Sequence, residues 1–271
     1  MPACAVVVRD SLSLAYWRWP GTGPAALLLH GIANYARYWD FFADEVASRL
    51  GLVATDARGH GDSARPREGY APADFVADAI AVLDAVGWRR PLVVGHSMGG
   101  SHATAFATAH PDRVAGLVIV DNSPEPMASG SERARRLTSQ RPERFADAAE
   151  AEAYLRQTSP GYTDAVYANR LRWAFRADGE GLAWRSSRDA LARIFAAPRG
   201  DRWAALSSVR CPTLVVRGTR SNVLSETTYA RMLATISDAR GLELDAGHNV
   251  ALDRPRELAD AVVAFARGLP A

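Results

Sequence analysis

Residues 95–99, with the sequence Gly-His-Ser-Met-Gly, could support nucleophilic chemistry through Ser97. The apolar run Pro91–Val94 before them predicts a strand that is buried on both faces, and the small residues of Ser101–Ala109 predict a helix. Gly-x-Ser-x-Gly between a strand and a helix is typical of a sharp turn that exposes the serine hydroxyl. There the backbone N–H of Met98 and the helix dipole face a developing oxyanion. We therefore predict a catalytic role for Ser97, the alternative being an ordinary serine in a tight turn.

Strands and helices are predicted to alternate around this turn. Apolar runs predict strands, and apolar residues at helical spacing predict helices. Between residues 25 and 121 this alternation predicts a parallel sheet that helices cover on both faces. The predicted strands are 5–9, 12–19, 25–29, 52–55, 91–94, 114–120, 213–217 and 241–245, and the predicted helices are 37–50, 72–86, 101–109, 226–235 and 255–266.

The composition changes between residues 122 and 206. Arginine, alanine and acidic residues dominate there, and amphipathic helices are predicted at 131–141, 146–157, 162–175 and 186–196, with no strand. A helical insertion above a sheet has an underside, and some of its aromatic side chains should face a cavity over Ser97. We select Trp173, Phe175 and Trp184 as substrate-pocket candidates and expect the other aromatic residues to pack inside the insertion.

Size and composition are those of a soluble globular enzyme. The chain has 271 residues, 48% of them hydrophobic, and a net charge of only +2, so a nucleic-acid partner is not expected. All its basic residues are arginine. The lack of lysine excludes a Schiff-base lysine, a Ser-Lys dyad and a P-loop.

The cellular location is predicted to be the cytoplasm. Cys4 and Cys211 lie far apart in the sequence and are expected to be buried free thiols, which fits a reducing compartment. We find neither the charged and apolar regions of a signal peptide nor a run of about 18 apolar residues. No membrane partner is expected.

The whole chain resembles the α/β-hydrolase superfamily, and within it the group with a helical cap between the sixth and seventh strands. The resemblance rests on four motifs in the family's order: His30-Gly31, Asp56-x-Arg58-Gly59-His60-Gly61-x-Ser63, Gly95-x-Ser97-x-Gly99, and Gly247-His248 followed by Asp253-x-Pro255. It implies a mostly parallel eight-stranded sheet, a core domain of residues 1–121 and 207–271, and a helical cap of residues 122–206. Serine at the turn argues against epoxide hydrolases and haloalkane dehalogenases, which carry aspartate there.

The resemblance also implies roles for single residues. Ser97 is expected to be the nucleophile and His248 the general base, without a cofactor or a metal. The backbone amides of Ile32 and Met98 are expected to form the oxyanion hole. The remaining histidines of the motifs are expected to support the site.

The catalytic acid departs from the family pattern. The family usually places an aspartate shortly after the seventh strand, where this chain has Asn222. In one hypothesis the acid is Asp121, at the end of the sixth strand. In a second, Asn222 orients His248 and turnover is slow or specialised. In a third, the residue was changed for study or the protein no longer hydrolyses a substrate. Asp245, on the strand before His248, is a weaker candidate.

The leading functional hypothesis is a serine hydrolase that cleaves a small ester, lactone or thioester through an acyl-enzyme on Ser97. The same scaffold also supports C–C bond hydrolysis, lyase chemistry, acyl transfer and cyclisation in secondary metabolism. Asn222 makes these alternatives worth testing, because weak activation of water leaves time for another acceptor. A third alternative is a pseudoenzyme whose capped pocket only binds a small molecule.

Overall fold

The centre of the molecule is a sheet of eight strands, in the order β1-β2-β4-β3-β5-β6-β10-β11. The structure is a computed structural model, which describes residues 2–198 and 200–269. β2 pairs antiparallel with both β1 and β4, and the other neighbours are parallel, which confirms the predicted sheet. The strands are β1 (Ala3–Arg9), β2 (Leu12–Trp19), β3 (Ala25–Leu29), β4 (Gly51–Thr55), β5 (Leu92–His96), β6 (Gly116–Val120), β10 (Thr213–Gly218) and β11 (Ala239–Leu244).

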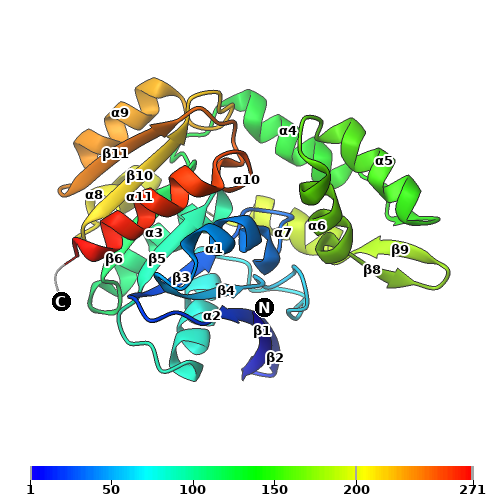
Figure 1. Cartoon of the computed structure of the whole chain (residues 1–271), viewed down its shortest axis with the longest axis horizontal. Helices are drawn as coiled ribbons and strands as arrows, with labels where there is room; N and C mark the ends of the chain where they lie inside the picture. The colour runs from blue at the N-terminus through cyan, green and yellow to red at the C-terminus, as the bar shows by residue number, and fades with distance from the viewer. Residues whose placement is uncertain (1, 199, 270–271) are drawn as a thin grey trace.

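Helices cover both faces of this sheet (Figure 1). Successive side chains of a strand point to opposite faces. On β5, Val94 packs in a cluster with residues of α1 (Asp40–Val46) and α11 (Pro255–Arg267). Its neighbour Val93 packs in a second cluster with residues of the helices on the other face. These are α2 (Pro72–Ala85), α3 (Met98–Ala109) and α9 (Glu226–Thr235). The strands between β3 and β10 are therefore buried on both faces, as continuous apolar runs predict.

The helix predicted at 37–50 is shorter in the structure. It consists of a 3-10 turn, η1 (Ala36–Trp39), followed by α1, which ends at Val46. Ala47 and Ser48 have φ angles of 43° and 62°, so the chain leaves the helix there. This turn brings the amide of Gly51 to the carbonyl of Pro24 and starts β4 beside β3. Two further short helices are η2 (Pro111–Arg113) and α10 (Val250–Asp253).

Residues 122–206, which we call the insertion, contain both helices and strands. The expectation of helices alone was wrong: three short strands form a separate sheet in the order β7-β9-β8. β8 and β9 join in a hairpin whose two-residue loop begins at Gly179, where φ is +62°. A glycine with positive φ is what such loops require. The elements are α4 (Ala128–Ser139), β7 (Arg144–Phe145), α5 (Ala148–Thr158), α6 (Asp164–Ala174), β8 (Phe175–Asp178), β9 (Gly181–Trp184), α7 (Arg188–Ala196) and α8 (Arg202–Ser207).

The insertion is attached to the loops that follow the sheet strands. The Tyr35 hydroxyl donates to Asn169 Oδ1 over 2.9 Å, and Asn169 Nδ2 donates to Asp40 Oδ2 over 2.9 Å. In Figure 1, α5, α6 and the β8–β9 hairpin project beyond one side of the sheet. The predicted domain boundary at 206/207 falls within α8, where buried Leu206 packs in the same cluster as residues of α3 and α9. The division into two domains stays a prediction.

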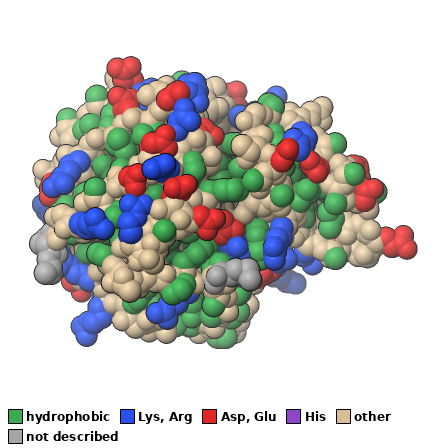
Figure 2. Space-filling model, in the orientation of Figure 1, with side chains coloured by type: hydrophobic (Ala, Val, Ile, Leu, Met, Phe, Trp, Pro, Cys, Tyr) green, Lys and Arg blue, Asp and Glu red, His purple; other side chains and the backbone are tan. Residues whose placement is uncertain are grey.

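The molecular surface carries charges of both signs. Figure 2 shows acidic and basic side chains interspersed on the visible face, among apolar and neutral atoms. Within the described residues, no helix is both long enough and apolar enough to span a membrane.

Candidate active site

The turn between β5 and α3 holds Ser97 in a strained conformation. Its φ and ψ are 53° and −120°, a combination that non-glycine residues rarely adopt. The flanking glycines make this turn possible. A Cβ at Gly95 would lie 2.2 Å from the carbonyl oxygen of Gly99, and a Cβ at Gly99 would lie 2.2 Å from that of Leu29. The close approach of α3 to β3 and β5 thus depends on both glycines.

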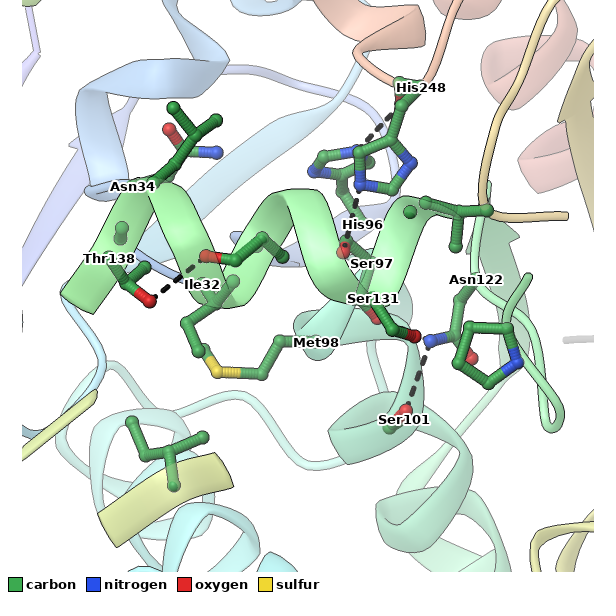
Figure 3. Close-up of a pocket in the computed structure, with 18 of the residues that line it drawn as sticks. Ile32, Asn34, His96, Ser97, Met98, Ser101, Asn122, Ser131, Thr138 and His248 are labelled. Atoms are coloured by element: carbon green, nitrogen blue, oxygen red, sulfur yellow. Dashed lines mark hydrogen bonds between the residues drawn. The ribbon is translucent and has the colours of Figure 1, made fainter. Parts of the chain in front are cut away.

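Ser97, His248 and Asp121 form a continuous hydrogen-bonded chain. His248 Nε2 lies 3.0 Å from Ser97 Oγ, and His248 Nδ1 lies 2.7 Å from Asp121 Oδ2. Figure 3 shows the imidazole of His248 above Ser97, reaching down from the loop before α10. This is the geometry in which an imidazole removes a proton from a serine hydroxyl while a carboxylate orients its other nitrogen.

Asp121 follows β6 and is completely buried. Besides His248, its carboxylate accepts hydrogen bonds from the Gly218 amide at 2.9 Å and from the Ser221 hydroxyl at 2.6 Å. Gly218 is the last residue of β10 and Ser221 follows it in the next loop. Their hydrogen bonds stabilise the charged carboxylate in a buried position. The segment after β10, where the family usually has its acid, therefore supplies hydrogen-bond donors to Asp121 at the end of the neighbouring strand β6.

The other two acid candidates lie elsewhere. Asn222 lines the cavity beside Ser97, and its backbone carbonyl lies against Gly130 of α4. The side chain of Asp245 is 66% exposed and pairs with two surface arginines. Among the three candidates, the structure brings Asp121 to His248.

The two predicted oxyanion-hole residues lie at the same cavity as Ser97. Ile32 and Met98 both line the cavity that contains Ser97, and Figure 3 shows them beside it. Met98 is the first residue of α3, so its N–H has no acceptor within the helix. The loop of Ile32 is fixed by the next residue, because the Ala33 amide donates to His60 Nε2 over 3.0 Å. The arrangement can present two backbone N–H groups to one substrate oxygen.

Three buried histidines support these loops in the neutral state. Burial lowers the pKa of His30 to about 4 and holds the pKa values of His60 and His96 well below their usual range. His30 Nδ1 donates to the Gly31 carbonyl and its Nε2 accepts from the Ala57 amide. His96 Nε2 donates to the backbone carbonyl of His248 over 2.9 Å, so it positions the loop that carries His248.

One supporting residue was missed by sequence reasoning. Asn122 Nδ2 donates to the backbone carbonyl of Ser97 over 2.7 Å and to Ser101 Oγ over 3.0 Å. It thereby ties the turn after β5 to the end of β6, as Figure 3 shows for its bond to Ser101. Its position next to Asp121 was the only sequence signal, and that signal is weak because it does not reveal which neighbouring strand the amide reaches.

A cavity of about 400 Å³ opens over Ser97 between the core and the insertion. Of the three aromatic residues predicted to line it, Trp184 does. Phe175 packs instead behind Trp184, with ring centroids 4.3 Å apart, and is 2% exposed. Trp173 of α6 packs edge-on against Trp17 of β2, with ring centroids 5.0 Å apart. Neither lines the cavity, because Trp173 lies on the side of α6 that meets β2, and Phe175, the first residue of β8, is buried against Trp184.

The described residues offer no group of three or more His, Cys, Asp and Glu side chains that could hold a metal ion. The groups that the structure places at the cavity are the serine hydroxyl, the imidazole with its buried carboxylate partner, and the backbone amides. Together they can form and break an acyl bond to Ser97.

Comparison with known proteins finds similar hydrolases. The chain is 27% identical to a 2-(acetamidomethylene)succinate hydrolase of Mesorhizobium japonicum, over 78% of this chain and 76% of that protein. It is 36% identical to a putative carbamate hydrolase of Caulobacter segnis, over 43% of this chain and 45% of that protein. The crystal structure of an E-2-(acetamidomethylene)succinate hydrolase superposes with a TM-score of 0.89 and 25% identity, covering 99% of this chain and all of that one.

The family assignment rests on the greater part of the chain. Residues 26–261, from β3 to the last helix, match the model of the alpha/beta hydrolase family. This segment includes all four motifs and the Ser97–His248–Asp121 chain. The protein belongs to the alpha/beta hydrolase family.

Proposed function

We propose that this protein is a serine hydrolase that cleaves a small ester, lactone or thioester through an acyl-enzyme on Ser97. The observation that carries the proposal is the hydrogen-bonded chain from Ser97 Oγ through His248 to Asp121, with distances of 3.0 and 2.7 Å. Ser97 lies in the cavity that the insertion covers, so a substrate there meets the hydroxyl.

Acylation follows from these positions. Ser97 Oγ attacks the substrate carbonyl carbon while His248 Nε2 takes the hydroxyl proton, and Asp121 stabilises the imidazolium that forms. The negative charge moves to the carbonyl oxygen, where the amides of Ile32 and Met98 receive it. The tetrahedral intermediate then collapses, and His248 gives the proton to the departing alcohol or thiol.

Deacylation reverses these roles. Water enters, His248 takes one of its protons, and the resulting hydroxide attacks the acyl carbon of the ester on Ser97. Collapse releases the carboxylic acid, and the proton returns from His248 to Ser97 Oγ.

The position of Asp121 beside His248 supports hydrolysis over a non-hydrolytic role. The argument for a non-hydrolytic role was that an amide, Asn222, occupied the usual position of the acid.

Amide or carbamate cleavage is a second candidate, favoured by the names of the two relatives. The same steps apply, except that His248 must protonate a poorer leaving group, an amine. Turnover of a matched nitrophenyl ester and nitroanilide of the same acyl group distinguishes the two candidates. A ratio of ester to anilide kcat/KM above about 10³ supports an esterase, and a ratio near unity supports an amidase.

Hydrolysis of short-chain nitrophenyl esters by the wild type and by Ser97→Ala tests the proposal. We expect a pre-steady-state burst of nitrophenol equal to the enzyme concentration from the wild type when deacylation is slow. Ser97→Ala should lose the burst and at least about 10³-fold in turnover, because the residual rate comes from the oxyanion hole and binding alone. Equal rates from the two proteins would refute an acyl-enzyme on Ser97.

A further inference from the structure

The charged side chains that line the cavity over Ser97 all have the same sign. No Asp or Glu is present among the described residues of its lining, although acidic residues are nearly as numerous as basic ones in the chain, 30 against 32. A cleft lined by one sign of charge attracts ligands of the opposite sign. The charged residues of the lining are Arg133, Arg135, Arg141, Arg170 and Arg202.

Arg141 is the buried member of this set. It is 4% exposed, and its guanidinium is held in place on two sides. Nη1 donates to Ser186 Oγ over 2.9 Å, and Nη2 donates to the Ser186 carbonyl over 2.6 Å. The guanidinium carbon lies 4.5 Å from the ring centroid of Trp184, which also lines the cavity. The cation is therefore rigid before any ligand binds.

No carboxylate of the described residues forms an ion pair with Arg141. The charged group that most affects it is another cation, because burial and then the neighbouring Arg188 lower the pKa of Arg141 to about 10. It thus remains charged at neutral pH. A buried charge without a counter-ion has a large desolvation cost, which an anionic ligand can offset.

Two further polar groups of the cavity lining are Tyr154, which lies near Arg141, and Arg170. Tyr154 of α5 packs its ring against that of Trp184, with centroids 6.0 Å apart. Burial raises the pKa of the Tyr154 hydroxyl, while the nearby guanidiniums of Arg141 and Arg170 oppose this rise. Arg170, on α6, likewise has no carboxylate partner among the described residues. Arg141 and Tyr154 therefore both contact the ring of Trp184, and Arg170 is close enough to Tyr154 to influence its hydroxyl. We call Arg141, Tyr154 and Arg170 the arginine cluster.

We propose that the arginine cluster binds a carboxylate of the substrate, so that the preferred substrate is an acyl compound with a free carboxylate beside its scissile carbonyl group. An arginine guanidinium presents parallel N–H groups that match the two coplanar oxygens of a carboxylate, and the hydroxyl of Tyr154 adds a third donor. This inference rests on the proposed function, since the anchored carboxylate holds the other carbonyl group against Ser97.

Protection of Ser97 from a fluorophosphonate probe tests binding directly. Succinate should slow labelling of the wild type, whereas the neutral isostere succinamide and inorganic phosphate should have little effect. In Arg141→Met, the succinate concentration that halves the labelling rate should rise about 10- to 100-fold, as expected for the loss of a charge-assisted hydrogen bond. Protection by phosphate or succinamide as strong as that by succinate overturns the inference.

A matched pair of esters tests the substrate preference. The 4-nitrophenyl ester of succinic acid carries a carboxylate where the ester of 4-methylpentanoic acid carries an isopropyl group of similar shape. We expect the wild type to prefer the succinyl ester in kcat/KM by at least tenfold. Arg141→Met should reduce this ratio at least tenfold, and Arg141→Lys should give an intermediate ratio because it keeps the charge but loses the paired donors.

Arg136→Met is the matched control. Arg136 lies on α4 and is exposed, and it is not among the lining residues of the cavity. It should leave the ester ratio and the succinate protection at wild-type values. If Arg141→Met lowers kcat/KM for both esters equally, Arg141 has a structural role and the inference is wrong.

The outcomes separate this inference from the proposed function. If Ser97 is not labelled and the ester is not turned over, the proposed function fails and the inference fails with it. If Ser97 is labelled normally but succinate gives no protection and the ester ratio is near unity, the inference alone is overturned.

Discussion

Replacing Asp121 by asparagine removes the negative charge that faces His248. Asp121 accepts three hydrogen bonds, from His248 Nδ1, the Ser221 hydroxyl and the Gly218 amide. The side chain of asparagine has one acceptor oxygen and one NH₂ donor. If the oxygen stays with the Gly218 amide, the NH₂ group faces His248. The imidazole must then accept at Nδ1 and carry its proton on Nε2, so Ser97 loses its base.

The expected loss is about 10⁴-fold in kcat, the size of the same change in a serine protease. This corresponds to about 5.5 kcal/mol of transition-state stabilisation, at 1.36 kcal/mol for each factor of ten. KM should change little, because Asp121 is buried beneath His248 and lies outside the cavity lining. The kcat for a nitrophenyl ester and the rate of fluorophosphonate labelling should fall by similar factors.

Asn222→Ala is the control that compares the two acid candidates. It leaves the carboxylate–imidazole pair intact and should keep kcat within tenfold of the wild type. A thermal melt of each variant shows whether a loss of activity reflects unfolding. An Asp121→Asn protein whose kcat stays within tenfold of the wild type would refute this role of Asp121, as would a folded Asn222→Ala protein whose kcat falls 10³-fold.

Three further predictions concern the support of the site. In a urea titration, Gly99→Ala should lower the unfolding free energy by at least about 2 kcal/mol, because its Cβ would lie 2.2 Å from the Leu29 carbonyl oxygen. Gly268→Ala is the control and should have little effect, because its Cβ would lie 3.6 Å from the nearest atom, the Phe265 carbonyl oxygen. His60→Phe leaves the Ala33 amide without its acceptor, so kcat should fall about tenfold or more with little change in KM; an unchanged kcat would mean that this bond does not position Ile32. Lowering the pH from 7 to 5 should destabilise the fold, because the unfolded chain protonates His30, His60 and His96 below about pH 6.5 while the folded chain does not. Asp56 acts in the opposite direction: burial raises its pKa to about 6, so below that pH the folded chain takes up one proton that the unfolded chain does not. Together these groups should lower the free energy of unfolding by roughly 2–3 kcal/mol per pH unit near pH 5. A urea midpoint that stays constant or rises on acidification would contradict this prediction.

The strands of the core could be predicted to within one or two residues. Continuous apolar runs such as Ala25–Leu29 and Thr213–Gly218 have few alternatives to a doubly buried strand. The β8–β9 hairpin was missed because its strands are only four residues long: the helix predicted at 162–175 included Phe175, and no element was predicted for residues 176–185. Its signal was the Asp178-Gly179 pair, which is typical of a tight hairpin loop.

The site could be predicted wherever local sequence determines geometry. Ser97 and Met98 follow from a strand, a turn and a helix that are contiguous in the chain. The partner of His248 could not be predicted, because the ends of β6 and β10 lie side by side and either could reach the imidazole. The cavity lining also depends on how the insertion packs on the core. For this reason Trp184 lies at the cavity, whereas Trp173, eleven residues earlier, packs on β2.

Ser97 is the proposed nucleophile, and His248 and Asp121 are proposed to activate it. The most direct test is to treat the wild type with a fluorophosphonate and to locate the adduct by peptide mass spectrometry. We predict one adduct per chain, on Ser97, no adduct in Ser97→Ala, and an adduct that forms at least 10³-fold more slowly in Asp121→Asn. An adduct on another residue, or a wild type that remains unlabelled while folded, would contradict the account.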